Sequence, residues 1–158
     1  MKISQRACFT LAATALFFAL VPAAVDLFPS LADSQDTDCD IDRGPCTKSL
    51  GETGITATFE LLPRPVQTLK TLLCRVDLKQ GQLPVTDRFV RLSFSMPGMY
   101  MPENAVVLRH AGKGIYEGNV IIVRCPSGMK LWRAEAQIGR LSDRARHPNR
   151  VSYTFTVR

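Results

Sequence analysis

The sequence contains none of the common catalytic motifs. It has no G-x-S-x-G, no H-E-x-x-H and no glycine-rich phosphate loop behind a predicted strand. It has only two histidines, His110 and His147, and neither has a catalytic partner adjacent in the sequence. Internal repeats and low-complexity tracts are also missing. These absences argue against an enzyme and against a repeat protein, so we expect a non-enzymatic domain.

The sequence also lacks sustained helical periodicity after residue 54. Apolar residues alternate in short runs, which is typical of half-buried strands, and Pro, Gly or Asn separates the runs. We predict about seven strands, over residues 55–62, 72–78, 89–95, 105–109, 115–124, 131–138 and 151–157. With no helices to form crossovers, this pattern predicts an all-β, antiparallel immunoglobulin-like sandwich. Trp132 is expected in its core.

The chain begins with the features of an export signal. Lys2 and Arg6 precede an apolar stretch over residues 7–25, which would form a signal helix. Small residues allow cleavage after Ala23 or after Ala32, and the second point is favoured because an acidic stretch follows it. An uncleaved membrane anchor is the alternative. We therefore expect a periplasmic or extracytoplasmic protein that contacts a membrane only if this leader is retained.

The chain is predicted to have three parts. Residues 1–32 form the signal peptide, residues 33–54 an acidic, cysteine-containing leader, and residues 55–158 the sandwich domain. The aspartates between residues 36 and 42 alternate as in a calcium loop, but Ile41 stands where that loop needs glycine and Thr47 where it needs glutamate. We interpret the leader as a solvated segment.

Positive charge predominates, with a net charge of +6 for the whole chain. The arginines near the C-terminus are Arg140, Arg144, Arg146, Arg150 and Arg158. They lack interleaved aromatic residues, which argues against nucleic-acid binding. A solvated surface is the simplest interpretation, and a docking surface for an acidic partner is the alternative.

Four cysteines remain once Cys8 is removed with the signal. An even number in an exported chain favours two disulfides. Of the three connectivities we prefer Cys39 with Cys46, across a short loop, and Cys74 with Cys125, between strands. The other two connectivities remain open.

Three methionines occur in the heptapeptide MPGMYMP, residues 96–102. Pro97 and Gly98 occupy the central positions of a type II turn, which would bring Met96 and Met99 close together. If the chain continues extended, Met101 points to the same side as Met99. Thioether sulfur is a soft ligand, so the cluster predicts a Cu(I) site.

Other interpretations of this heptapeptide stay open. His110 is close enough in sequence to add a nitrogen ligand. Met96 or Met99 could instead cap the end of the core, since methionine fills irregular gaps. Met99, Tyr100 and Met101 could also form an apolar docking patch without metal.

The motifs SFSMPGMYMP, AVVLRHAGKGIYEGNV and PSGMKLWRAEAQI, in this order, resemble the FixH and YtkA-like family of exported or membrane-anchored proteins. The resemblance covers about a third of the chain directly. It implies an immunoglobulin-like sandwich in the cell envelope, often associated with copper supply or cation transport for respiratory oxidases. It also implies that Met96, Met99 and Met101 are metal ligands and that Tyr116 and Trp132 are framework residues.

This chain departs from the family pattern in its four mature cysteines and its acidic C-x6-C leader. Cys125 and Met129 flank the turn PSG, and they would enlarge the sulfur site if that turn meets the methionine loop. We therefore expect an exported protein that binds Cu(I) for delivery or homeostasis. Its partner would be an envelope or membrane protein, such as an assembly factor of a copper-requiring oxidase.

Overall fold

The computed structural model describes residues 37–143 and 148–158. The predicted signal peptide at residues 1–32, with its alternative role as an anchor, lies outside the described residues, as do Arg144, Arg146 and His147. Within the described part of the chain, no helix is long and apolar enough to cross a membrane.

The described residues form an all-β, antiparallel sandwich, which confirms the predicted fold class. The strands are β1 (Cys46–Ser49), β2 (Ile55–Leu62), β3 (Thr71–Gln80), β4 (Leu83–Pro84), β5 (Arg88–Ser95), β6 (Asn104–Gly112), β7 (Ile115–Ile121), β8 (Leu131–Arg140) and β9 (Asn149–Thr156). Short 3-10 helices follow β1 and β8, namely η1 (Gly51–Thr53) and η2 (Leu141–Asp143). Each of the seven predicted strands is present, and the short β1 and β4 were not predicted.

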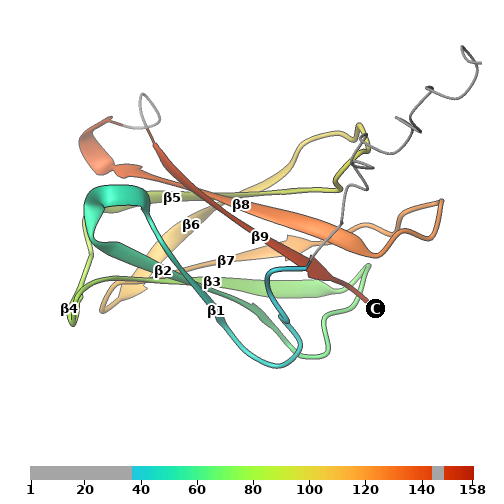
Figure 1. Cartoon of the computed structure of the whole chain (residues 1–158), viewed down its shortest axis with the longest axis horizontal. Helices are drawn as coiled ribbons and strands as arrows, with labels where there is room; N and C mark the ends of the chain where they lie inside the picture. Colours follow the sequence, from blue (N-terminus) through green and yellow to red (C-terminus); the bar gives the residue numbers. More distant parts are fainter. Residues whose placement is uncertain (1–36, 144–147) are drawn as a thin grey trace, which may run out of the picture. The chain divides into compact units, whose positions relative to one another are not determined.

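The strands lie in two layers (Figure 1). β1, β2, β3 and β7 are neighbours in one layer, with β4 paired to β3, and β5, β8 and β9 are neighbours in the other. β6 belongs to both layers. Its first half, Asn104 to Leu108, pairs with β5, and its second half, from Arg109, pairs with β7. This one strand therefore joins the two layers along one edge.

Alternation of side chains builds the core between the layers. The inward-facing residues of β2 are Ile55, Ala57, Phe59 and Leu61, and all are buried. Phe59 packs against Tyr153 of β9 with ring centroids 5.1 Å apart. The Tyr153 hydroxyl donates to the Ala57 carbonyl at 2.7 Å, and burial raises the pKa of Tyr153. Trp132 has no exposed surface, so its predicted core position is confirmed.

The acidic segment before β2 is part of the domain, unlike the solvated leader that we predicted. Ile41 and Leu50 are fully buried in the main core. A carboxylate oxygen of Asp38 accepts from the Thr154 amide at 2.8 Å, and one of Asp42 accepts from the Val66 amide at 2.7 Å. These aspartates hold neighbouring backbone in place, so the packed domain starts well before residue 55.

The cysteines confirm one predicted disulfide and not the other. Cys39 and Cys46 are bonded, whereas Cys74 and Cys125 are free and buried. Cys74 lies opposite Gly118 in the β3–β7 register, and Cys125 is the seventh residue after Gly118. When the chain reaches Ile122 it is already opposite Leu69, which precedes the first residue of β3, Thr71. Cys125 therefore lies past the end of the strand that carries Cys74, too far along to pair with it.

The turn between β6 and β7 requires glycine at position 114. Gly114 has a φ of 78°, and a Cβ there would lie 2.6 Å from the Leu78 carbonyl oxygen. Gly114→Ala should lower the free energy of unfolding by about 2–4 kcal/mol, from the left-handed conformation and the clash together.

Gly81→Ala is the matched control, because Gly81 has a φ of 61° and no atom lies within 4 Å of the position that a Cβ would take. Its cost should be about 1 kcal/mol, from backbone conformation alone. Urea unfolding of both variants checks the difference. Equal losses of unfolding free energy in the two variants would contradict the close approach of β3 to this turn.

Candidate metal centre

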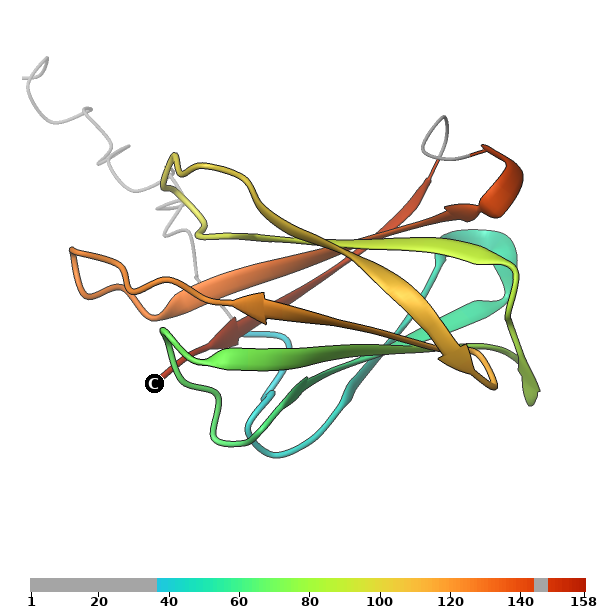
Figure 2. The ribbon, with the colours of Figure 1, turned by 180° about the vertical axis from the view of Figure 1, so that it is seen from behind.

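Two loops meet at one end of the sandwich. Residues 96–103 connect β5 to β6, and residues 122–130 connect β7 to β8. Because β6 is antiparallel to both β5 and β7, the start of β6 lies at the same end as the end of β7. Figure 2 shows both loops at this end. The Asn104 side-chain amide donates to the Ile121 carbonyl at 3.0 Å and ties the bases of the loops together.

The predicted turn in the first loop is formed. Gly98 has a φ of 75°, and the Met99 amide donates to the Met96 carbonyl at 3.2 Å. Positive φ at the third position with this hydrogen bond is the geometry of a type II turn. The turn therefore holds the heptapeptide in a defined conformation.

The three methionines of the heptapeptide do not share one environment. Met96 is only 3% exposed and belongs to the hydrophobic core, so it caps the core instead of joining an open cluster. Met99 and Met101 are half-buried and pack against the edge of that core. Tyr100 between them is fully exposed. The prediction that Met96 contributes to the site needs correction, because its side chain continues the inward-facing row of β5.

The turn of the second loop meets Met99 through Cys125. The Cys125 thiol lies 3.8 Å from the Met99 thioether sulfur. On its other side, the Cys125 Sγ is 2.9 Å from the Ser127 hydroxyl oxygen. A hydrogen bond from the Gly128 amide to the Cys125 carbonyl, at 3.1 Å, closes the turn. The condition for a larger sulfur site, contact between the two loops, is therefore met.

The surroundings of Cys125 favour its thiolate. The hydrogen bond with the Ser127 hydroxyl lowers the pKa of Cys125 the most, and backbone amides of residues 127–129 act in the same direction. Partial burial opposes them, but the net direction is downward. Cys74 contrasts with it, because burial without such hydrogen bonds raises the pKa of that thiol to about 12. Of these two free cysteines, Cys125 is the one whose thiolate is favoured, so it is the better anionic ligand.

The geometry around Cys125 suits a soft metal. Two ligands bonded at about 2.3 Å with an angle of about 110° stand about 3.8 Å apart, the separation found between Cys125 and Met99. Met129 lines the same cavity as Cys125, with a volume of about 210 Å³. Met129 therefore brings a further thioether to the side of Cys125, and Met101 is half-buried against the core in the facing loop. These donors are one thiol and thioethers, the soft ligand types that favour soft metal ions.

His110 does not join this cluster. It lies in the second half of β6, opposite Tyr116, with ring centroids 5.1 Å apart. The methionine loop precedes the first residue of the same strand, Asn104. Six residues of strand span about 20 Å. The predicted nitrogen ligand is therefore at the wrong end of β6.

No alternative site of harder ligands competes with this cluster in the described residues. Across residues 37–143 and 148–158, no group of three or more His, Cys, Asp and Glu side chains converges to hold a metal. Comparisons with known proteins add no assignment, since no protein-family model, curated protein or solved structure matches the chain.

Cys125 should be the thiol that reacts in the native protein. Of the two free cysteines in the described residues, we expect iodoacetamide to modify Cys125 at pH 7–8 and Cys74 only after unfolding, since the pKa of Cys74 is raised to about 12. The pH at half-maximal rate should lie below that of an ordinary cysteine, because hydrogen bonding with the Ser127 hydroxyl lowers the pKa of Cys125.

Ser127→Ala should move this midpoint to higher pH, because it removes the largest cause of the lowered pKa. Cys125→Ser is the control and should abolish this labelling, leaving Cys74 unmodified in the native protein. Mass spectrometry of the alkylated peptides measures both effects. Equal labelling of Cys74 and Cys125, or an unchanged profile in Ser127→Ala, would contradict this description of the loop.

Proposed function

We propose that this protein binds Cu(I) at the meeting point of the two loops and hands it to a partner in the cell envelope. Cys125 supplies a thiolate and Met99 a thioether, with Met129 and Met101 as the nearby sulfur donors. The observation that carries the proposal is the 3.8 Å separation of the Cys125 and Met99 sulfurs. Soft sulfur ligands select Cu(I) over harder cations.

The disulfide between Cys39 and Cys46 supports an extracytoplasmic location, because such bonds persist in oxidising compartments. A free thiol of lowered pKa is exposed to oxidation there. Bound Cu(I) would occupy the sulfur lone pairs and protect the thiolate. A free, activated Cys125 is therefore consistent with a protein that is loaded with metal during its working cycle.

The position of the cluster suits transfer. Cys125 is 5% exposed, on a loop at the surface of the domain, and Met99 lies half-buried on a neighbouring turn. A small movement of either loop would expose the Cys125 thiol to a partner, while the strands of the core stay in place. Since loops move more readily than the strands that carry them, the site can exchange its metal.

A metal-free docking role is the second candidate. It rests on Tyr100, a large side chain with its whole surface exposed between two methionines. A Tyr100 variant can distinguish the two functions, because no hydrogen bond joins Tyr100 to Cys125 in the described structure. Tyr100→Ser should leave Cu(I) affinity unchanged and weaken only partner binding.

Anaerobic competition with a chromophoric Cu(I) chelator tests the proposal. We expect one site per chain, weakened at least about 100-fold by Cys125→Ser and about tenfold by Met99→Leu, since each removes a ligand. Met96→Leu is the matched control. It should leave the affinity unchanged, because the Met96 side chain continues the inward-facing row of β5.

The pH dependence of the same titration distinguishes thiolate from thioether ligation. Affinity should fall as pH decreases, since a proton competes for the Cys125 thiolate. Met99→Leu should keep this dependence and Cys125→Ser should lose it. Unaltered Cu(I) affinity in both variants would contradict the proposal.

A further inference from the structure

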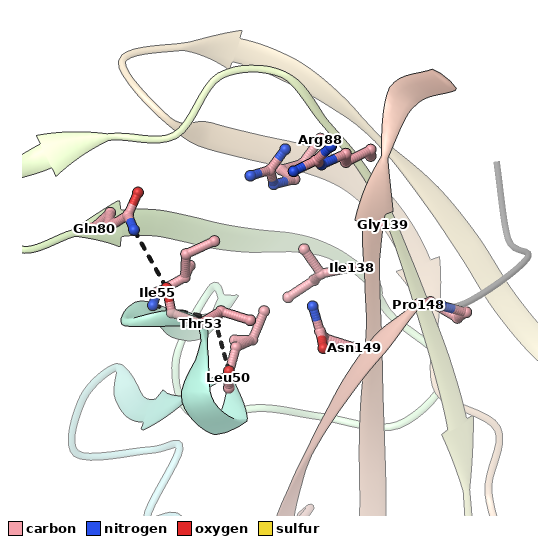
Figure 3. Close-up of a pocket in the computed structure, with 10 residues that line it drawn as sticks. Leu50, Thr53, Ile55, Gln80, Arg88, Ile138, Gly139, Pro148 and Asn149 are labelled. Atoms are coloured by element: carbon pink, nitrogen blue, oxygen red, sulfur yellow. Dashed lines mark hydrogen bonds between the residues drawn. The ribbon is translucent and has the colours of Figure 1, made fainter. Parts of the chain in front are cut away.

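A polar pocket lies at the other end of the sandwich, where β5 begins. Its volume is about 400 Å³, within the size range of small-molecule sites. Its walls are formed by η1, the start of β2, the end of β3, the start of β5, the end of β8 and the start of β9 (Figure 3). The sulfur cluster follows the far end of β5, so the two sites are separate.

Two arginines line this pocket side by side. Arg88 of β5 and Arg140 of β8 are direct partners in the antiparallel register. Side chains of such partners leave the sheet on the same face, with Cβ atoms about 4.5–5.5 Å apart, and like charges in this position repel each other. A sheet has no structural need for this arrangement. An anion bound by both guanidinium groups would remove this repulsion, and its binding would be favoured for that reason.

Among residues 37–142 and 148–158, one carboxylate pairs with Arg88 and none with Arg140. Arg88 is largely covered, with 18% of its side chain exposed, and its Nη1 lies 3.0 Å from a carboxylate oxygen of Asp87. That nitrogen is buried and lacks a well-directed hydrogen bond within the described structure. Asp87 is 75% exposed, so water screens this ion pair. Arg140 forms no ion pair with a carboxylate among residues 37–142 and 148–158.

The rest of the lining is suited to a polar organic molecule. Gln80 is held by donating to the Thr53 carbonyl at 3.3 Å, a hydrogen bond drawn in Figure 3. Asn149 points into the pocket from the opposite wall. Amide side chains can donate to and accept from hydroxyl groups. The pocket thus presents two positive charges beside neutral hydrogen-bonding groups.

We infer that this pocket binds a small organic dianion with its charge on Arg88 and Arg140 and its hydroxyl or carbonyl groups on Gln80 and Asn149. The shared chemistry is a doubly charged oxyanion on a short polar skeleton. Phosphate esters and dicarboxylates both carry it. This inference is independent of the copper proposal, since no residue is common to the two sites.

Isothermal titration of the exported protein tests the inference with glycerol 3-phosphate and L-malate as probes. At least one of them should bind at one site and exceed inorganic phosphate in affinity by about tenfold or more. The better probe identifies whether both charges sit on one group or on two. Arg88→Gln and Arg140→Gln should each weaken it at least tenfold.

Arg150→Gln is the matched control. Arg150 lies on β9, forms an ion pair with Glu135 and does not line the pocket, so its loss should change affinity less than twofold. Thermal unfolding without ligand gives the second readout. Arg140→Gln should leave the midpoint equal or higher, because it relieves repulsion.

Three results would overturn the inference. One is the absence of saturable binding for both probes. Another is equal weakening by Arg150→Gln, which would indicate diffuse surface charge. The third is a marked fall in the unfolding midpoint of Arg140→Gln, which would make Arg140 a structural residue.

Discussion

The division of β6 between the two layers is the constraint on which the rest of the structure depends. Its first half is bonded to β5 and its second half to β7, so the loop that enters β6 and the loop that leaves β7 must lie at one end. Gly118 of β7 allows this crossing, since a Cβ there would approach Leu108 and Val106 of β6 to about 3 Å. The contact between Met99 and Cys125 follows from this backbone arrangement.

The same constraint explains why sulfur atoms so close in sequence have different roles. Met96 ends the inward row of β5 and seals the core, whereas Met99 lies beyond the turn and reaches the second loop. Cys74 faces the core from the middle of β3, and Cys125 faces the loops. Burial keeps one thiol protonated, while hydrogen bonds favour the thiolate of the other. Position in the fold therefore sets the environment of each sulfur atom.

Much of the fold could be predicted because the strands alternate strongly. The predicted strand 55–62 coincides with β2, and the Pro-Gly turn at Pro97 is formed. β1 was missed because its four residues, CTKS, are short and mostly polar, and only pairing with β2 makes them a strand. The sequence predicts a solvated acidic leader, because the backbone groups that its aspartates bind, such as the Thr154 amide, are distant in sequence.

The candidate site was only partly predictable. The inward position of Met96 could have been recognised, because it continues the alternation of Val90, Leu92 and Phe94. That Cys125 is free could not be recognised from the sequence, since it depends on how far the chain of β7 continues past the position opposite Cys74. His110 was included on sequence proximity alone, and the length of a strand separates it from the loop.

X-ray absorption spectroscopy of the Cu(I)-loaded protein tests most directly whether the two loops share one metal. We predict a first shell of sulfur atoms only, at about 2.3 Å. Cys125→Ser and Met99→Leu should each remove one sulfur from that shell, and Met96→Leu should remove none. A shell of nitrogen or oxygen atoms, or a sulfur count unchanged in both ligand variants, would contradict a shared Cu(I) site.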